Sequence, residues 1–221
     1  MTYSGQAGTM QSATHTTSDS ATPAWVFDLD GGVLCLNFVN THSSSSGEHL
    51  GSYADLVEFA HQSALLTRSE ADRLHALVAR QPKAGANVLQ RAKRLRQALF
   101  GIFTAVAAQE SPSARDLEVL NAELATSLTH ARLEPADGEF RWGWSGDGLE
   151  RVMWPIVRSA ADVLASETQR RAVRECGAGD CRWLFLDTSK NRSRQWCSMQ
   201  SCGNREKARR HYQRIRARRS G

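Results

Sequence analysis

Hydrophobic residues recur at every third or fourth position over most of residues 52–167, a spacing typical of helices that bury one face. The pattern predicts helices over residues 52–65, 67–80, 84–109, 114–129 and 149–167. Thr67 and Glu70 have the spacing of a capping box, and Ser113 is the predicted N-cap of the fourth helix. Trp154-Pro155 allows a kink in the last helix, because proline removes a backbone hydrogen bond.

Shorter apolar segments predict a small amount of β structure around these helices. Residues 132–134 and 139–144 predict a β-hairpin closed by an Asp-Gly turn. Residues 26–28 are expected to form a short strand, whereas residues 33–41 fit either a strand or a helix. The predicted fold class is therefore α+β, mostly α, with an N-terminal helical body over residues 24–168.

The first segment of the chain, residues 1–23, is dominated by Ser, Thr, Gly and Ala. It lacks the apolar centre of a signal peptide and predicts a disordered leader. No stretch of the sequence approaches the ~18 apolar residues that a membrane span needs. We therefore expect a cytoplasmic protein with reduced thiols and no membrane partner.

Four cysteines near the C-terminus, Cys176, Cys181, Cys197 and Cys202, have the spacing C-x4-C-x15-C-x4-C. Two pairs of thiolates on two tight turns can surround one zinc ion, and a reducing compartment disfavours the alternative of two disulfides. Four thiolates leave no open coordination position, so the predicted Zn2+ is structural rather than catalytic. Without it, we expect everything from about residue 172 onward to unfold while the body survives.

The segment between the two cysteine pairs predicts the rest of this module, which spans residues 172–221. Residues 182–187 predict a short strand, residues 188–194 a polar basic turn, and Trp196 opens a returning segment. A turn, a hairpin and a helix around one zinc make a treble-clef-like or ribbon-like finger. Its aromatic residues could stack on bases, but a module this small needs them as core.

Positive charge is concentrated just before and after the last cysteine pair. Between residues 190 and 219 the chain has eleven Lys and Arg residues and one acid, whereas its total net charge is only +5. This asymmetry predicts a surface that binds a polyanion. A helix is expected from Asn204 as N-cap, with an apolar seam of Ala208, Tyr212 and Ile215 docked on the zinc module.

Arginine dominates this segment, and its planar guanidinium matches phosphates and guanine edges, so nucleic acid is the expected partner. The helix lacks the broad apolar face that membrane insertion needs. Arg205, next to the metal, could contact nucleic acid or brace the finger, and both roles stay open. The candidate nucleic-acid contacts are Lys190, Arg192, Arg194, Arg205, Lys207, Arg209, Arg210 and Arg214.

Several of these segments resemble a known family. Cys181-Arg182-Trp183-Leu184-Phe185-Leu186-Asp187, Arg194-Gln195-Trp196-Cys197-Ser198-Met199 and Cys202-Gly203-Asn204-Arg205 resemble the CGNR-type zinc finger. That finger occurs at the C-terminus of bacterial proteins that are predicted to be stress-related transcription regulators. An ABATE domain precedes the finger in these proteins. Residues 30–41 are similar to the opening motif of the ABATE domain. The resemblance implies an ABATE-like body followed by a CGNR finger.

Other chemistry is scarce in the body. The His residues are scattered without metal-ligand spacing, and no nucleophile motif is present, so no catalytic residues are assigned and no enzyme is expected. Cys35 lies among apolar residues and is expected to be a buried structural thiol. Asn37, Asn40 and Thr41 form the one polar cluster that could bind a ligand, or their side chains could satisfy backbone groups instead.

The sequence therefore predicts a zinc-dependent DNA-binding transcriptional regulator. Its body would sense an unknown small-molecule effector or form a homodimer. A finger that binds RNA or a protein is the alternative, since one fold serves many functions. An enzyme with a basic targeting tail is less favoured for want of a catalytic set.

Overall fold

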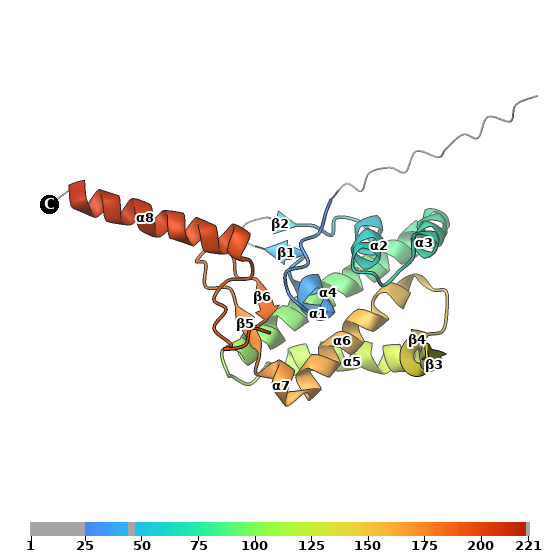
Figure 1. Ribbon diagram of the computed structural model, residues 1–221. Helices are drawn as coiled ribbons and strands as arrows, with labels where there is room; N and C mark the ends of the chain where they lie inside the picture. The colour runs from blue at the N-terminus through green and yellow to red at the C-terminus, as the bar shows by residue number, and fades with distance from the viewer. Residues whose placement is uncertain (1–24, 44–46, 220–221) are drawn as a thin grey trace, which may run out of the picture.

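The computed structural model describes residues 25–43 and 47–219 of the 221-residue chain (Figure 1). The predicted leader, residues 1–23, lies outside the described residues. Among the helices that are described, none is both long enough and apolar enough to pass through a bilayer.

The longest helix, α4 (Pro82–Ala107), runs through the middle of the body, and the other body helices pack around it (Figure 1). Its buried residues recur at the helical spacing that the sequence shows, so one face of α4 forms the centre of the core. The helices packed in the body are α1 (Leu34–Val39), α2 (Tyr53–Gln62), α3 (Arg68–Arg80), α5 (Ala114–His130), α6 (Trp154–Ala165) and the short α7 (Glu167–Arg170).

Helix ends follow the local sequence signals in most cases. The capping box at Thr67 is confirmed: its side chain accepts a hydrogen bond from the Glu70 amide, and Glu70 accepts one from the Thr67 amide. Ser113 is the N-cap of α5 by position, but its side chain makes no capping hydrogen bond.

The predicted single helix over residues 149–167 is wrong. A 3-10 turn, η1 (Leu149–Val152), precedes α6, and Pro155 lies in the first turn of α6, where its missing N–H costs nothing.

Within residues 25–43 and 47–219, three two-stranded antiparallel sheets accompany the helices. The predicted hairpin is confirmed as β3 (Ala131–Ala136) and β4 (Glu139–Trp144). A smaller pair, β1 (His42–Ser43) and β2 (Gly47–Glu48), follows α1. The third pair, β5 (Val173–Glu175) and β6 (Leu184–Leu186), begins the finger.

Two expectations near the N-terminus are resolved by the structure. The segment 33–41 forms a helix, α1, rather than a strand. The predicted strand over residues 26–28 is wrong, because the Phe27 amide donates to the Gln62 side chain at 2.8 Å instead of pairing with a strand. Cys35 is fully buried as expected, and burial raises the pKa of its thiol to about 12.

Strand β6 joins two hydrophobic cores. Leu184 and Leu186, with Val173 of β5, belong to the large core of the body. Phe185, between the two leucines, belongs instead to a small core around the four cysteines. Since successive side chains of a strand point to opposite faces, three residues are enough to pack the finger onto the body. The finger is therefore held against the body by a strand that contributes to both cores.

Candidate metal centre and basic helix

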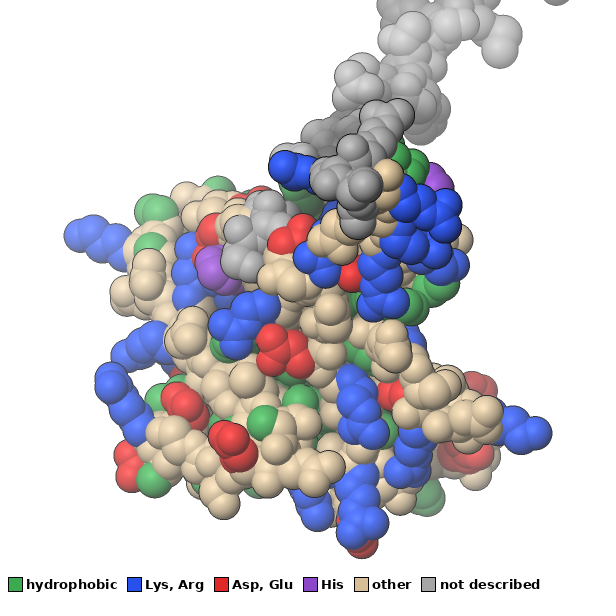
Figure 2. Space-filling view, turned by 90° about the vertical axis from the view of Figure 1, so that its left-hand side faces the viewer, with side chains coloured by type: hydrophobic (Ala, Val, Ile, Leu, Met, Phe, Trp, Pro, Cys, Tyr) green, Lys and Arg blue, Asp and Glu red, His purple; other side chains and the backbone are tan. Residues whose placement is uncertain are grey.

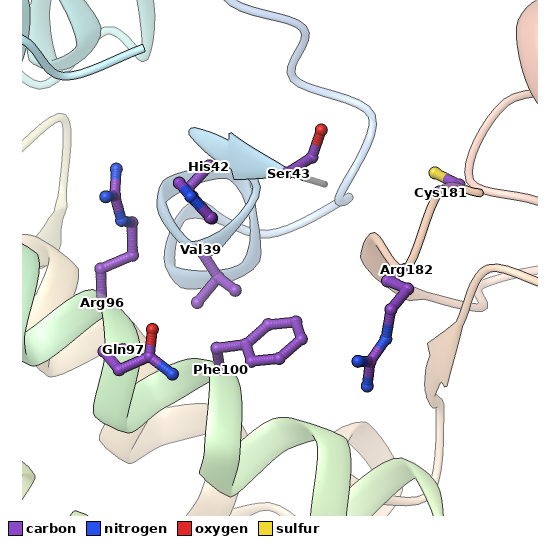
Figure 3. A pocket seen from close by; sticks show the side chains of 8 residues that line it. All are labelled: Val39, His42, Ser43, Arg96, Gln97, Phe100, Cys181 and Arg182. Carbon is purple, nitrogen blue, oxygen red and sulfur yellow. The ribbon is translucent and has the colours of Figure 1, made fainter. Parts of the chain in front are cut away.

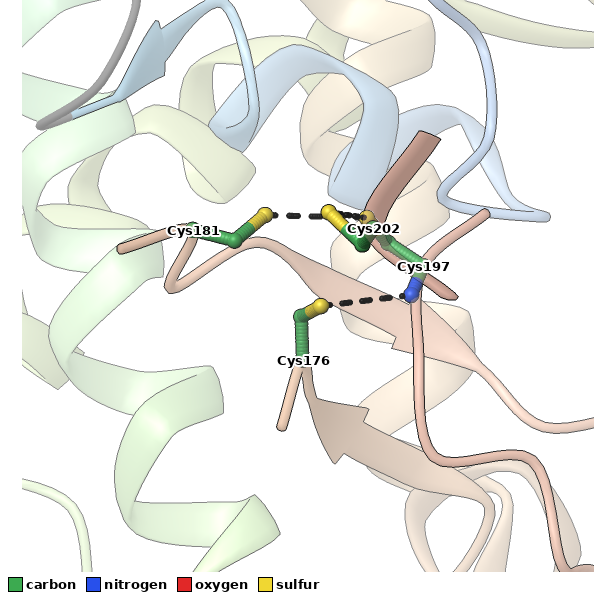
Figure 4. A group of neighbouring side chains, drawn as sticks. All are labelled: Cys176, Cys181, Cys197 and Cys202. Atoms are coloured by element: carbon green, nitrogen blue, oxygen red, sulfur yellow. Dashed lines mark hydrogen bonds between the residues drawn. The ribbon is translucent and has the colours of Figure 1, made fainter. Parts of the chain in front are cut away.

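The four predicted cysteine ligands come together at one point of the finger (Figure 4). Their sulfur atoms all lie within 4.8 Å of one another, and all four residues are buried. The Sγ of Cys197 lies 3.6 Å from that of Cys181 and 3.5 Å from that of Cys202. Tetrahedral zinc with Zn–S bonds of about 2.3 Å places its sulfur ligands about 3.8 Å apart. The cluster has the ligand type, number and spacing of one structural zinc site.

Short backbone segments hold the ligands in this arrangement. Cys176 directly follows β5, and a tight turn returns the chain to Cys181, whose amide donates to the Ala178 carbonyl at 3.0 Å. The Gly177 amide donates to the Gln195 carbonyl at 2.8 Å, which joins the two cysteine pairs. A Cβ atom at Gly177 would lie 3.2 Å from that same oxygen, so glycine permits the close approach. Cys202 lies in a π-helical turn, η2 (Met199–Gly203).

The thiols strongly affect one another's ionisation. Hydrogen bonds from Cys181 and then Cys197 lower the pKa of Cys176 to about 2. The contact with Cys176 raises the pKa of Cys181 to about 12, and the contacts with Cys176 and Cys181 raise the pKa of Cys197 still further. The neighbouring thiols thus stabilise a single thiolate at Cys176. Each additional thiolate in the cluster would repel the first. Four thiolates at this spacing need a cation among them, and a zinc ion supplies that charge.

The positive side chain of Arg205 lies beside the cluster. Its Nη2 atom donates to the Asp180 carboxylate at 3.0 Å and to the Cys202 sulfur at 3.3 Å. Burial opposes the charge of Arg205, but the negative charges of Cys202 and Asp180 outweigh it and raise its pKa. A guanidinium here offsets part of the excess negative charge of a tetrathiolate zinc site. These contacts can brace the finger through a thiolate and a carboxylate rather than a backbone carbonyl, and a contact of Arg205 with nucleic acid stays an untested prediction.

Arg194 also has several partners inside the protein. Its guanidinium lies 4.5 Å from the centroid of the Phe185 ring. It donates to the carbonyls of Trp196 at 2.9 Å and Asp30 at 3.2 Å, and also to that of Cys197. Arg194 therefore links the second cysteine pair to the start of the body.

The polar turn before Arg194 is closed by Asp187, a residue that the sequence did not single out. Its buried carboxylate accepts hydrogen bonds from the Ser189 amide and hydroxyl at 3.0 and 2.6 Å and from the Arg194 amide at 3.1 Å. Burial alone would raise the pKa of Asp187, but these hydrogen bonds lower it. An acid directly after an apolar strand, followed by Ser and Thr, is the signal that could have identified it. Lys190 and Arg192 lie exposed on this turn.

The pairing of the finger strand differs from the prediction. β6 pairs with β5, in the register Arg174 to Phe185, and not with the segment that begins at Trp196. The return segment is held by the Gln195 carbonyl and by Arg194 instead. Strand β5 carries little of the apolar pattern that predicts a strand, because only one of its three residues is apolar.

The basic helix is α8 (Asn204–Arg219), which leads away from the body and the finger (Figure 1). Asn204 is not an N-cap: it has helical φ and ψ angles, and its side chain donates to the Gln200 carbonyl at 3.1 Å, because η2 runs directly into α8. The docked seam is also wrong. Tyr212 is 71% exposed and Ile215 36%, because the helix extends past the zinc module.

Positive side chains cover α8. In the view from the side to which α8 points, Lys and Arg side chains gather in the upper right part of the molecule (Figure 2). Glu206, the one acid of the helix, is buried and accepts hydrogen bonds from Arg209 at 2.8 and 3.0 Å and from Arg210 at 3.1 Å. Both arginine side chains stay about three-fifths exposed, at 59% for Arg209 and 62% for Arg210. Lys207 and Arg214 are exposed as well.

The predicted ligand cluster of Asn37, Asn40 and Thr41 has partners within the protein. Asn37 accepts a hydrogen bond from the Gly31 amide at 2.8 Å. Thr41 donates to the Phe38 carbonyl at 2.7 Å and accepts from Arg96 at 2.9 Å. Asn40 pairs with the backbone of Leu184. The structure thus assigns these side chains to structural contacts, and a ligand at this cluster stays an untested prediction.

Comparison with family models gives two matches. The ABATE model, described as "Putative stress-induced transcription regulator", matches residues 32–167, which is more than half of the chain. The chain belongs to the ABATE family. The CGNR zinc finger model matches residues 172–215 and includes all four clustered cysteines. The order of an ABATE region followed by a CGNR finger is the one that the sequence motifs predicted. No curated protein matches the chain.

The two matches together support a zinc-binding protein of a transcription-regulator family. The match to the zinc-finger model and the four-sulfur cluster together support one structural zinc ion in the finger. Neither family model describes an enzyme.

Proposed function

We propose that this protein is a cytoplasmic, zinc-dependent DNA-binding transcriptional regulator, with α8 as its main DNA contact. The position of α8 supports this most. The helix begins next to the last zinc ligand and has eight Lys and Arg residues against one Glu. Its 16 residues correspond to about 24 Å, which is enough to follow the major groove across several base pairs.

The candidate contacts divide into two groups by their partners. Arg194 and Arg205 are tied to the finger, so we assign them the task of orienting the DNA-binding surface. The exposed cations of the polar turn and of α8 would neutralise phosphates: Lys190, Arg192, Lys207, Arg209, Arg210 and Arg214. Zinc contributes by fixing the start of α8 relative to the turn that carries Lys190 and Arg192.

A titration of the zinc-loaded protein with duplex DNA at several salt concentrations tests the proposal. Phosphate contacts release counterions, so affinity should fall steeply as salt rises. Parallel titrations with a hairpin RNA separate the alternative of an RNA-binding finger. DNA binding that is independent of salt, or unchanged when residues 204–221 are deleted, would remove α8 as the nucleic-acid surface.

The proposal includes a homodimer, in which a second copy would supply a second basic helix. The register of β3 and β4 places Leu133 opposite Trp142 and Pro135 opposite Phe140, on the same face of the hairpin. Leu133 is 61% and Phe140 73% exposed. Adjoining exposed apolar side chains mark interaction surfaces. The hairpin lies at the end of the body away from α8, so pairing through it leaves both basic helices accessible (Figure 1).

A further inference from the structure

A cavity of about 190 Å3 lies between the body and the finger (Figure 3). Three parts of the chain form its walls: the end of α1 with β1, the middle of α4, and Cys181 with Arg182 of the finger. Its lining residues are Val39, His42, Ser43, Arg96, Gln97, Phe100, Cys181 and Arg182. Neither Asn37, Asn40 nor Thr41 is among them.

One side of the cavity is apolar, and a cationic side chain lies beside it. Val39 of α1 and Phe100 of α4 approach each other on one side (Figure 3). Arg182 extends from the finger toward α4, and its guanidinium carbon lies 5.5 Å from the centroid of the Phe100 ring. Gln97 also lies on α4, one helical turn before Phe100, and its side chain is exposed. An aromatic surface beside a guanidinium is suited to a molecule with both a ring and an anionic group.

The charges of the cavity leave one guanidinium available. Arg96 is already occupied, because it donates to Glu48 at 2.8 and 2.5 Å and to Thr41 at 2.9 Å. Arg182 donates to Glu175 at 3.1 Å through Nε alone. The two terminal nitrogens of Arg182 can therefore form the two parallel hydrogen bonds that a carboxylate accepts.

We propose that this cavity binds a small monocarboxylate with a single ring or a short alkyl chain. The apolar part packs against Val39 and Phe100, the carboxylate accepts from Arg182, and the Gln97 amide donates a further hydrogen bond. The volume sets the size, since a cavity of about 150 Å3 already holds benzene. That this carboxylate acts as an effector rests on the proposed regulatory function, whereas its binding does not.

The site is placed to act on the metal centre. Arg182 directly follows the zinc ligand Cys181, and its φ of 56° lies in the left-handed region that residues other than glycine rarely adopt. A carboxylate that holds the Arg182 side chain also restrains the backbone of the first cysteine pair. The bound acid would thereby change the position of the finger relative to α4, and with it the surface that meets DNA.

Calorimetric titration of the zinc-loaded full chain with benzoate tests the binding. We expect one saturable site, with affinity lowered about tenfold to a hundredfold in Arg182→Gln, because a hydrogen bond to a charged group is lost. The neutral probe benzamide should bind more weakly than benzoate by a similar factor. The matched control is Arg73→Gln, at an exposed position of α3, which should bind benzoate as the native protein does.

Amide chemical shifts of the titrated protein locate the site independently. Benzoate should move the signals of Val39, Gln97 and Phe100, and zinc content should be equal in native protein and in Arg182→Gln. Absence of saturable benzoate binding, equal affinity in Arg182→Gln, or equal affinity for benzamide would each overturn the site.

DNA titrations of the same samples separate this inference from the proposed function. Benzoate binding without any DNA binding would leave the site standing and remove the regulator. DNA binding without benzoate binding would remove the site and leave the proposed regulator standing. A benzoate-dependent change in DNA affinity that Arg182→Gln abolishes supports the effector role, and DNA affinity that benzoate leaves unchanged overturns that role.

Discussion

The side-chain amide of Asn40 pairs with the backbone of Leu184, 144 residues further along the chain. Its Nδ2 atom donates to the Leu184 carbonyl at 2.9 Å, and the Leu184 amide donates to Oδ1 at 3.0 Å. Both residues are buried. Asn40 thus pairs with one edge of β6 as a neighbouring strand would, while β5 pairs with the other. This contact, together with the shared core, ties the end of α1 to the finger.

Replacing Asn40 by Asp should destabilise the whole protein. The variant loses the donor to the Leu184 carbonyl and brings a buried negative charge against that oxygen. We expect the free energy of unfolding to fall by about 2–3 kcal/mol, measured by urea denaturation at neutral pH. Asn37→Asp is the matched control, because Asn37 only accepts a hydrogen bond, from Gly31, and a carboxylate accepts it equally well. Equal loss of stability in the two variants would contradict this role of Asn40.

Local sequence signals predicted the helices, the hairpin and the zinc ligands, because spacing and capping residues act within a few positions. The chain could not reveal contacts over long sequence separations. The pairing of Asn40 with Leu184 and the division of β6 between two cores depend on how α1 meets the finger. The predicted seam on α8 failed for the same reason, since periodicity shows which residues share a face but not what covers it.

Metal removal should affect the finger unevenly. The sequence alone predicts unfolding from about residue 172, but Leu184 and Leu186 are part of the body core and their amides bond to Asn40 and to the Gly31 carbonyl. In Cys197→Ser we expect loss of zinc and fast hydrogen exchange at Cys181 and Gly203, with Leu184 and Leu186 still protected.

Cys35→Ala is the control for this experiment, because Cys35 lies in the body core away from the metal ligands. This variant should keep one zinc per chain by metal analysis. Full zinc content in Cys197→Ser would refute the metal site. Fast exchange at Leu184 equal to that at Cys181 would instead show that the finger unfolds as one unit.

Acid should weaken the contact between β2 and α4. Partial burial opposes the charge of Glu48, but hydrogen bonds from Arg96 and from the Leu50 amide, with the charges of Arg96 and Lys93, lower its pKa to about 2. A lowered pKa in the folded state stabilises the protein above the unfolded value of 4.5, and this stabilisation is lost as pH falls toward 2. After allowance for solvent screening, Glu48→Gln should lose about 1–2 kcal/mol of stability at pH 7.

The pH dependence distinguishes this ion pair from a simple packing defect. The difference in stability between native protein and Glu48→Gln should shrink between pH 4.5 and 2, followed by urea denaturation at each pH. Glu118→Gln, at an exposed position of α5, should stay within about 0.5 kcal/mol of native protein at neutral pH. A gap between Glu48→Gln and native protein that stays constant down to pH 2 would disprove the contribution of charge.

Self-association through the β3–β4 hairpin should depend on one face only. Phe140→Ser removes an aromatic side chain from the exposed apolar face and should shift the protein to monomer in sedimentation equilibrium. Glu139→Ser changes the neighbouring residue, which points to the opposite face, and should leave the association unchanged. A monomeric native protein at micromolar concentration would remove the homodimer from the proposal.

Salt dependence of DNA binding should count the phosphate contacts of the basic surface. Contacts from the six exposed candidates would give a slope of about −5 in a plot of log K against log salt, at ~0.9 per phosphate. Arg214→Ala should make the slope less steep by about 1 and weaken all sequences alike, with zinc retention unchanged.

Arg205→Ala should weaken DNA binding and also speed zinc loss to a chelator, because Arg205 is bonded to Asp180 and to the Cys202 sulfur. Arg73→Ala, on α3, is the control and should change neither quantity. Normal zinc retention in Arg205→Ala together with altered sequence preference would mean that Arg205 reads DNA directly rather than bracing the finger.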